Sequence, residues 1–512
     1  MVTPSSAVAP TFNEQEIPPV TRIVGSDRRL FWISVFGWTV LHVALAMLTP
    51  ISGDEAYYWD CARHFDWAYF DQPGGVIWPI AIFRLLFGDT ALAVRAPAIT
   101  FSFLTAIFVL GLVRRLGGTH RHAAAAYALL HGMPFFFLGS FYESTDIGLT
   151  TAFAAATWAA VSIAQGERRA WWGFGLATGL GFLAKFPAVL VVPAIIPALG
   201  RREIRRQLTT PTPWLAAALS FTLTAPVWIW AVQHDWANIS FQLEDRHKSG
   251  ALSLKYLGEF LGVNLLLATP FLAVALVIAL WILARRAGAD GWAVIVATII
   301  PFLFFGLISL HGRVGPHWGG PALVTGAVVL ALTPFRGRRV LVILGMVFGL
   351  SLCFGVAAAV TYPKALMDLE WSYGGRPKRI NTGQLARILG NEEITAELAL
   401  RLRPEETLLL TSYSDAHLYA LVSRGTLQTR LAHLAEGKHG LASLYWYEEN
   451  DLLGQTALVA TEKERILQVL PQYCTTLEVL PPITVSLKTE IIRTVYLYRC
   501  VGITRDEGAF SR

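Results

Sequence analysis

The chain has 512 residues, of which 54% are hydrophobic and only 15% are charged, whereas a soluble domain carries roughly a quarter charged residues. This composition excludes an ordinary soluble protein and predicts many membrane spans. The net charge of +6 is modest, and no glycine-rich phosphate loop or nucleic-acid motif accompanies it, so nucleic-acid partners are not indicated.

Residues 1–29 are polar and proline-rich, and they predict a cytoplasmic tail. The apolar run that follows, 30–49, lacks a signal-cleavage pattern and predicts an uncleaved anchor. Ten further apolar runs bring the expected number of transmembrane helices to about eleven. They are 96–113, 123–142, 147–164, 171–184, 186–199, 214–232, 260–284, 292–310, 318–334 and 340–360.

Every second loop between these runs is rich in arginine, which the positive-inside rule assigns to the cytoplasm. These arginines are Arg114, Arg115, Arg121, Arg168, Arg169, Arg201, Arg202, Arg205, Arg206, Arg285, Arg286, Arg336, Arg338 and Arg339. The alternate loops carry the acids and histidines and are predicted to lie outside.

One segment tests this topology, because residues 171–199 are interrupted by Lys185 and Pro187. A single kinked helix here would place the following arginines outside. The arginine pattern therefore favours two short spans, with Lys185 at an outer turn inside a protein-lined cavity.

Two regions are expected on the outer face. The first outer loop, 51–92, contains a short apolar stretch at 76–87 that predicts an interfacial helix. Residues 362–512 alternate β-like runs (407–411, 456–460, 491–498) with helical patterns such as 416–422, which predicts a small soluble α/β domain. The predicted division is a tail at 1–29, a transmembrane module at 30–361 and the α/β domain at 362–512.

The four cysteines form no C-x-x-C pair, so no zinc or redox motif is indicated. Cys474 and Cys500 lie in the same predicted outer domain. They either pair there, as an oxidising compartment permits, or remain two free buried thiols.

Asp54 and Glu55 lie at the outer end of the first span. Adjacent residues of a helix point about 100° apart. We therefore expect one carboxylate to face a substrate cavity and the other to brace the local structure. The alternative is an ordinary solvated acidic start of a helix.

Further charged groups lie at the outer ends of other spans, and for each one capping or snorkelling is the alternative to a functional role. They converge on the face where the positive-inside rule does not expect cations. These residues are Asp71, Arg95, Asp146, Lys185, Arg246, His247 and His317.

Such a set suits one kind of chemistry. Carboxylates act as general bases toward a hydroxyl or amine acceptor, while arginine and lysine hold a phosphate or neutralise it as it leaves. A site at the membrane edge suits a donor with a lipid tail. The residues therefore favour glycosyl transfer from a polyprenyl phosphate sugar.

Several segments resemble the GT-C glycosyltransferases, in particular the bacterial relatives of protein O-mannosyltransferases and of lipid A aminoarabinose transferases. The resemblance covers roughly residues 30–330. It rests on Asp54-Glu55-Ala56-Tyr57-Tyr58, Tyr69-Phe70-Asp71-Gln72-Pro73, Val94-Arg95-Ala96, Thr145-Asp146, Gly181-Phe182-Leu183-Ala184-Lys185-Phe186, Pro226-Val227-Trp228-Ile229-Trp230 and His317-Trp318.

The resemblance implies a polytopic GT-C fold and an inverting hexosyl- or pentosyltransferase. Asp54 would be the leading catalytic carboxylate, with Glu55 and Asp71 beside it. Arg95 and Lys185 match positions associated with the carrier phosphate, and Asp146 matches an acid of the same cavity. Arg246 and His317 are further candidates for substrate binding.

A divalent metal is the one cofactor that the resemblance implies, with Asp71 and His247 as candidate ligands. Here the run is Asp71-Gln72-Pro73-Gly74, without the lysine and second proline of the aminoarabinose branch. The metal and the sugar specificity therefore do not carry over from that branch.

The expected partners are a polyprenyl-phosphate sugar donor, a lipid, polysaccharide or protein acceptor, and the bilayer of a bacterial inner membrane, with the α/β domain periplasmic. A transporter or flippase of a lipid-linked saccharide is the second hypothesis. Against it, the charges gather at the ends of spans and not at the midplane. A non-catalytic receptor or assembly factor is the third, and it leaves the outer acids unexplained.

Overall fold

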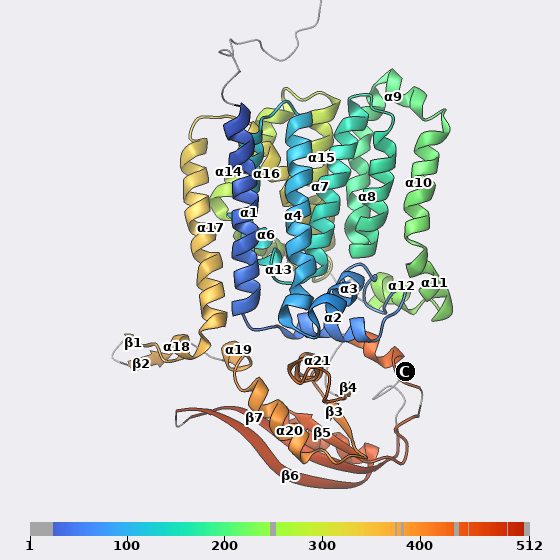
Figure 1. The fold of residues 1–512 in the computed structure, drawn as a ribbon, viewed down its shortest axis with the longest axis vertical. Coiled ribbons are helices and arrows are strands. Elements are labelled where there is room, and N and C mark those ends of the chain that lie inside the picture. Colours follow the sequence, from blue (N-terminus) through green and yellow to red (C-terminus); the bar gives the residue numbers. More distant parts are fainter. Residues whose placement is uncertain are drawn as a thin grey trace, which may run out of the picture.

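The computed structural model describes residues 24–245, 252–373, 376–379, 383–434, 440–448, 450–488 and 490–505. A bundle of helices forms one part, and a smaller domain built on a sheet lies across one end of it (Figure 1). Within the described residues, five helices are long and apolar enough to cross a membrane: α1 (Val24–Leu48), α4 (Ala91–Arg115), α7 (Thr145–Ala164), α15 (Ala289–Ile308) and α17 (Arg338–Thr361). The prediction of a polytopic helical membrane protein is confirmed.

Two bent pairs of helices bring the candidate spans of the described chain to seven. α10 (Pro211–Leu223) and α11 (Ala225–Gln233) meet at 44°, and α13 (Leu254–Leu267) and α14 (Pro270–Ala284) meet at 95°. The shorter helices of this part are α2 (Gly53–Arg63), α3 (Ile77–Phe87), α5 (His120–His131), α6 (Pro134–Gly139), α8 (Ala170–Ala184), η1 (Phe186–Gly200), α9 (Arg202–Gln207), α12 (Ala237–Ser240), η2 (Phe241–Asp245), η3 (Gly320–Ala322) and α16 (Leu323–Leu332).

The predicted break at Lys185 is confirmed. Lys185 ends α8 and precedes η1, a 3₁₀ helix, with an extended backbone between the two. The two helices fold back on each other, since a Cβ added at Gly181 would lie 3.1 Å from the Cβ of Ala188. Pro187, at the start of η1, lacks the N–H that a continuous helix would need. The segment is therefore a hairpin of two short helices and not one kinked span.

The arginine-rich loops gather at the end of the bundle that lies opposite the sheet domain, where α9 is drawn in Figure 1. Arg115 pairs with Glu167, and Arg201 donates to the carbonyl of Ala164 at 2.5 Å. Arg121 lies 3.8 Å from Asp27. Loops that the positive-inside rule assigns to one side of a membrane thus lie together.

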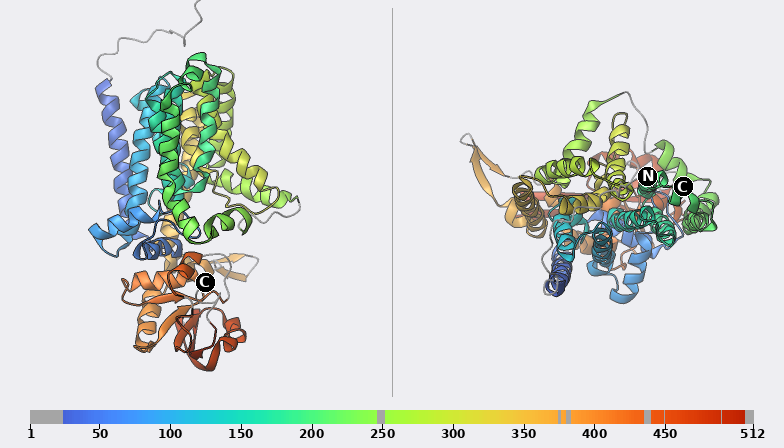
Figure 2. Two further views of the ribbon diagram at one scale, coloured as in Figure 1. Left: turned by 90° about the vertical axis from the view of Figure 1, so that its right-hand side faces the viewer. Right: turned by 90° about the horizontal axis from the view of Figure 1, so that it is seen from above.

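The C-terminal part contains a five-stranded mixed sheet in the order β4-β3-β5-β7-β6. β3 pairs in parallel with β4 and β5, and β7 runs antiparallel to β5 and β6. Helix α21 lies between the sheet and the bundle (Figures 1 and 2). The elements are α18 (Pro363–Met367), β1 (Glu370–Tyr373), β2 (Arg376–Arg379), α19 (Gly383–Ala386), α20 (Asn391–Arg401), β3 (Thr407–Leu410), α21 (Tyr413–Val422), β4 (Thr429–Leu431), η4 (Leu441–Tyr445), β5 (Ala457–Thr461), η5 (Glu464–Gln468), η6 (Leu470–Tyr473), β6 (Cys474–Leu487) and β7 (Glu490–Ile503).

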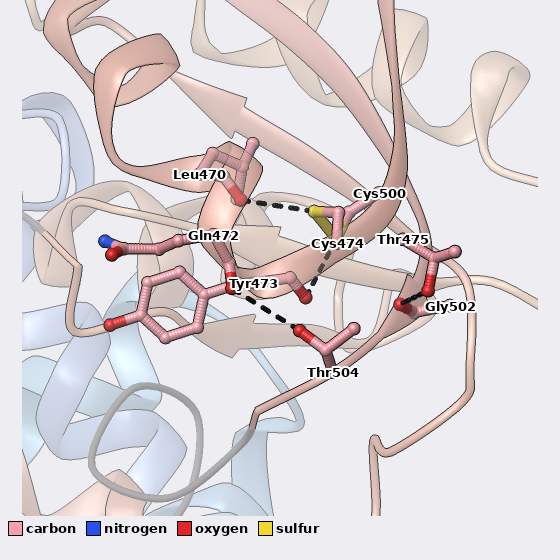
Figure 3. The surroundings of a disulfide bond; sticks show 8 residues. All are labelled: Leu470, Gln472, Tyr473, Cys474, Thr475, Cys500, Gly502 and Thr504. Atoms are coloured by element: carbon pink, nitrogen blue, oxygen red, sulfur yellow. Dashed lines mark hydrogen bonds between the residues drawn. A yellow bond between two sulfur atoms is a disulfide. The ribbon is translucent and has the colours of Figure 1, made fainter.

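Cys474 and Cys500 form a disulfide that joins β6 to β7 (Figure 3). Backbone and side-chain hydrogen bonds flank it: Thr475 donates to the carbonyl of Gly502 at 3.0 Å, and the Thr504 amide donates to the carbonyl of Tyr473 at 2.9 Å. Of the two possibilities for these cysteines, the structure contains the pair. Cys61 and Cys353 are free and buried.

The disulfide makes a direct prediction about thiol labelling. We expect the denatured protein to react with alkylating reagent at two cysteines before reduction and at four afterwards, because disulfide sulfurs do not react. The mass shift of the intact chain measures both numbers. Four labelled cysteines before reduction, in protein purified without reductant, would contradict the pairing.

Candidate functional site

A cavity of about 1420 Å³ lies where the bundle meets the sheet domain. Its wall is built from α2, the segment that follows it, the start of α7, the α8–η1 turn, the end of α15 and the start of α21. Five of the predicted residues line it together: Asp54, Asp71, Asp146, Lys185 and His317. Groups that lie far apart in the sequence therefore share one site.

Asp54 faces the cavity because of the way α2 begins. Ser52 is the N-cap, and its hydroxyl accepts from the Glu55 amide at 3.2 Å while Glu55 Oε2 accepts from the Ser52 amide at 3.0 Å. This capping box holds the Glu55 side chain in the interior of the protein. Asp54, one residue earlier, is exposed to the cavity and accepts hydrogen bonds from Tyr413 and, at 3.3 Å, from Tyr142.

Glu55 and Arg95 lie outside the cavity and form a buried pair. Arg95 Nε donates to Glu55 Oε1 at 2.6 Å, and its Nη2 donates to Oε2 at 2.8 Å. The same guanidinium donates to the carbonyls of Ala46, Thr49 and Pro50. Arg95 is 1% exposed and Glu55 is fully buried. Arg95 thus connects α1, α2 and α4 and is not among the residues that line the cavity.

Asp146, Lys185 and His317 form the second polar cluster of the cavity. Lys185 Nζ donates to Asp146 Oδ1 at 2.8 Å, and His317 Nε2 lies 3.4 Å from Oδ2. Ser144, not Asp146, is the N-cap of α7. Lys185 Nζ lies 5.7 Å from the centre of the Trp318 ring. A cation that is held by a carboxylate and an aromatic face at the edge of a cavity can bind an anionic group such as a phosphate.

Asp71 lies in the wall between these groups and does not cap α3. Tyr57 donates to its Oδ2 at 2.8 Å, and Gln242 donates to its backbone carbonyl at 2.8 Å. Within the described part of the chain, no three His, Cys, Asp or Glu residues are grouped so that they could hold a metal. His247, the other predicted ligand, lies outside the described residues, as does Arg246. The described residues therefore do not fit a metal site, and no step is assigned to one.

Four tyrosines surround the acids, and two of them were missed by the sequence analysis. Tyr57 and Tyr58 belong to the quoted motif, and burial raises the pKa of Tyr58 well above its ordinary value, with Asp54 adding to the effect. Its hydroxyl therefore stays protonated. Tyr142 and Tyr413 had no signal of their own, because Tyr413 comes from the soluble region, more than 350 residues after Asp54.

Much of the remaining wall of the cavity is apolar. It includes Leu190, Leu267 and Phe305, together with Val189, Phe304 and Leu307, which are exposed. The cavity therefore joins a polar centre to an exposed apolar wall.

Comparison with known proteins finds similar chains. Residues 71–230 match the dolichyl-phosphate-mannose-protein mannosyltransferase family. This part of the chain is therefore similar to a family of membrane glycosyltransferases. The resemblance predicted from the sequence motifs is therefore confirmed.

Two curated relatives show the extent of the match. The lipid A galacturonosyltransferase RgtD of Rhizobium johnstonii is 26% identical over 312 residues, which are 58% of this chain and 63% of that protein. The undecaprenyl phosphate-alpha-4-amino-4-deoxy-L-arabinose arabinosyl transferase of Edwardsiella ictaluri is 27% identical over 388 residues, 67% of each chain. The chain thus spans less than two thirds of the length of RgtD.

The fold has a solved counterpart. ArnT from Cupriavidus metallidurans, determined in the apo state and bound to undecaprenyl phosphate, superposes with a TM-score of 0.65 at 14% identity, covering 93% of this chain and 98% of that one. The similarity includes both the bundle and the C-terminal domain, since so much of each chain is covered.

Proposed function

We propose that the protein transfers a sugar from a polyprenyl-phosphate donor to a lipid acceptor at the outer face of the membrane. The observation that carries the proposal is the single cavity in which an exposed carboxylate, Asp54, and a cation, Lys185, share a space with exposed apolar side chains in its wall. A soluble sugar donor would need no such apolar wall. The relatives named above act on lipid A or use undecaprenyl phosphate sugars, which supports the same substrate class.

The proposed reaction is a direct displacement with inversion. Asp54 accepts the proton of the acceptor hydroxyl, whose oxygen forms a new bond to the anomeric carbon. The bond from that carbon to the phosphate oxygen breaks, and the electron pair leaves with the polyprenyl phosphate. Lys185, which is paired with Asp146 beside His317, would neutralise the charge that develops on this leaving group.

The roles of the other predicted residues follow from their positions. Asp146 would orient Lys185, and Asp71 would hold Tyr57 at the cavity wall. Glu55 and Arg95 would act through structure alone, because their charged groups are buried against each other. This replaces the direct catalytic and phosphate-binding roles that the resemblance implies for them.

The topology is part of the proposal. Counting α5 with α6, α8, η1 and α16 as short spans beside the seven candidates gives eleven. The arginine-rich end would face the cytoplasm, and the 362–512 domain would lie in the periplasm of a bacterial inner membrane. The Cys474–Cys500 disulfide supports this orientation, since such bonds persist in oxidising compartments.

A transfer assay with purified protein tests the proposal. Radiolabelled sugars on polyprenyl phosphate, offered as a panel of hexosyl, uronosyl and aminopentosyl donors, are incubated with wild type and a lipid extract of bacterial envelopes. We expect label to move into the lipid fraction with at least one donor. Failure with every donor, together with movement of intact donor across liposomes, would overturn it in favour of a flippase.

Lys185→Met should lower kcat/KM for the active donor by about 10²-fold, because the leaving phosphate loses its cation. The matched control is Lys255→Met, an exposed lysine at the start of α13. Both variants are assayed at several donor concentrations, and their unfolding temperatures are compared. Wild-type kinetics in a folded Lys185→Met protein would exclude the phosphate role.

A further inference from the structure

The sheet domain packs unusually closely against the start of α2. A Cβ added at Gly53 would lie 1.7 Å from Oγ of Ser414 and 2.9 Å from its Cα, closer than real Cβ atoms come. Only glycine therefore allows this approach of α21 to α2. Gly53 precedes Asp54, and Ser414 follows Tyr413, so the tight contact lies directly beside the cavity.

Two further contacts fix the domain along α2. His417 Nδ1 lies 2.8 Å from Asp60 Oδ2, and the two side chains are 2% and 4% exposed. Burial raises the pKa of Asp60, but the hydrogen bond and charge of His417 outweigh burial and hold it below its ordinary value. Arg63 donates to Gln428 Oε1 at 3.3 Å. The C-terminal domain thus contacts α2 directly, in addition to its chain connection through α17.

This orientation brings Tyr413 to Asp54. Its hydroxyl donates to Asp54 Oδ1, while Tyr142 of the bundle donates to Oδ2 at 3.3 Å. Gly440 packs directly against Tyr413, since a Cβ at Gly440 would lie 2.8 Å from the Cβ of Tyr413. Its φ of +68° also favours glycine. Both Tyr413 and Gly440 line the cavity.

We propose that Tyr413 is a positioning residue for Asp54, so that the catalytic site is complete only when the C-terminal domain is docked on α2. The inference rests on the proposed function, because it assigns Tyr413 a role in the reaction of that same carboxylate. Two hydroxyls, one from each part of the protein, hold the Asp54 carboxylate in position.

The kinetic constants of transfer distinguish this role from a structural one. Losing one hydroxyl donor leaves the Asp54 carboxylate less firmly positioned, which lowers kcat and leaves binding of the donor unchanged. The titratable and charged groups around Asp54 remain the same in a Tyr413→Phe variant. They are Glu55 and Tyr58 on α2, Tyr142 before α7, and Asp71, Asp146 and Lys185 across the cavity.

The first test is Tyr413→Phe, which keeps the ring and removes the hydroxyl. We expect kcat to fall about 10-fold and the KM for the lipid-linked donor to stay unchanged. Tyr362→Phe, at an exposed tyrosine after α17, is the control and should behave as wild type. A Tyr413→Phe enzyme with the wild-type kcat would overturn the inference.

The second test moves the domain and leaves Tyr413 intact. Gly53→Ala should produce the same fall in kcat and faster hydrogen exchange in 413–422, because the added methyl cannot coexist with Ser414. Adding Ser414→Gly should partly restore both. Gly258→Ala, where a Cβ meets no atom within 4 Å, is the control.

The outcomes separate the two proposals. A wild-type protein that transfers no sugar overturns the proposed function and this inference with it. An active wild type, with Gly53→Ala and Tyr413→Phe both retaining its kcat, overturns the inference alone.

Discussion

Replacing Asp54 by asparagine should lower kcat/KM for sugar transfer by about 10³-fold, within the range typical of a lost general base. Asparagine keeps the size of the side chain, and its single carbonyl oxygen still accepts a hydrogen bond from one of the two tyrosines that bond Asp54, but it cannot accept the acceptor's proton. Because Asp54 is exposed to the cavity, we expect the unfolding temperature in detergent to stay within about 1 °C of wild type. Initial rates with the active donor measure the effect.

The control for this variant is Asp290→Asn, at a carboxylate in the first turn of α15, which does not line the cavity. It should transfer at the wild-type rate. If Asp54→Asn keeps more than a tenth of the wild-type activity, Asp54 is not the base. Asp71→Asn and Asp146→Asn would then identify which other acid of the cavity accepts the proton.

Breaking the Glu55–Arg95 pair should cause the largest loss of stability. Arg95→Met leaves the Glu55 carboxylate buried without its cation and removes the donor of three backbone carbonyls. Removing one partner of a buried pair costs about 3–5 kcal/mol. We expect a clear drop in the unfolding temperature in detergent, and reduced yield of folded protein.

A more exposed ion pair serves as the control for this loss of stability. Arg84 and Asp89 are bonded at 2.6 Å but are 21% and 28% exposed, so Arg84→Met should cost only about 1 kcal/mol. If Arg95→Met proved as stable as Arg84→Met and instead raised the KM for the donor, the buried pair would not be structural. The phosphate-binding role implied by the family resemblance would then hold.

The sequence predicted the broad architecture because its signals are local. Apolar runs specify helices, and the break at Lys185, together with the arginine-rich loops at the far ends of the two runs, predicted a hairpin that the structure contains. The prediction that Asp54 and Glu55 face different ways is also confirmed, since it needs only the 100° step of a helix. The apolar stretch at 76–87 forms α3 (Ile77–Phe87) at the end of the bundle, as expected.

Contacts between distant segments could not be predicted in this way. Arg95 carries the same charge as Lys185 and also lies at the predicted outer end of a span, yet one is buried against Glu55 and the other faces the cavity. Only the packing of α1, α2 and α4 decides between these outcomes. Tyr413 was missed for the same reason, because the soluble region has no motif that connects it with Asp54.

The hydrogen bond between Tyr413 and Asp54 joins residues 359 positions apart, and this separation sets the order of events during synthesis. At 5–20 residues per second, the ribosome needs roughly 20–70 s to make the intervening chain. For that time α2 exists without α21 against it. A partly synthesised chain that is already inserted in the membrane thus lacks the Tyr413 contact to Asp54. We therefore expect nascent molecules to transfer no sugar until the C-terminal domain has folded.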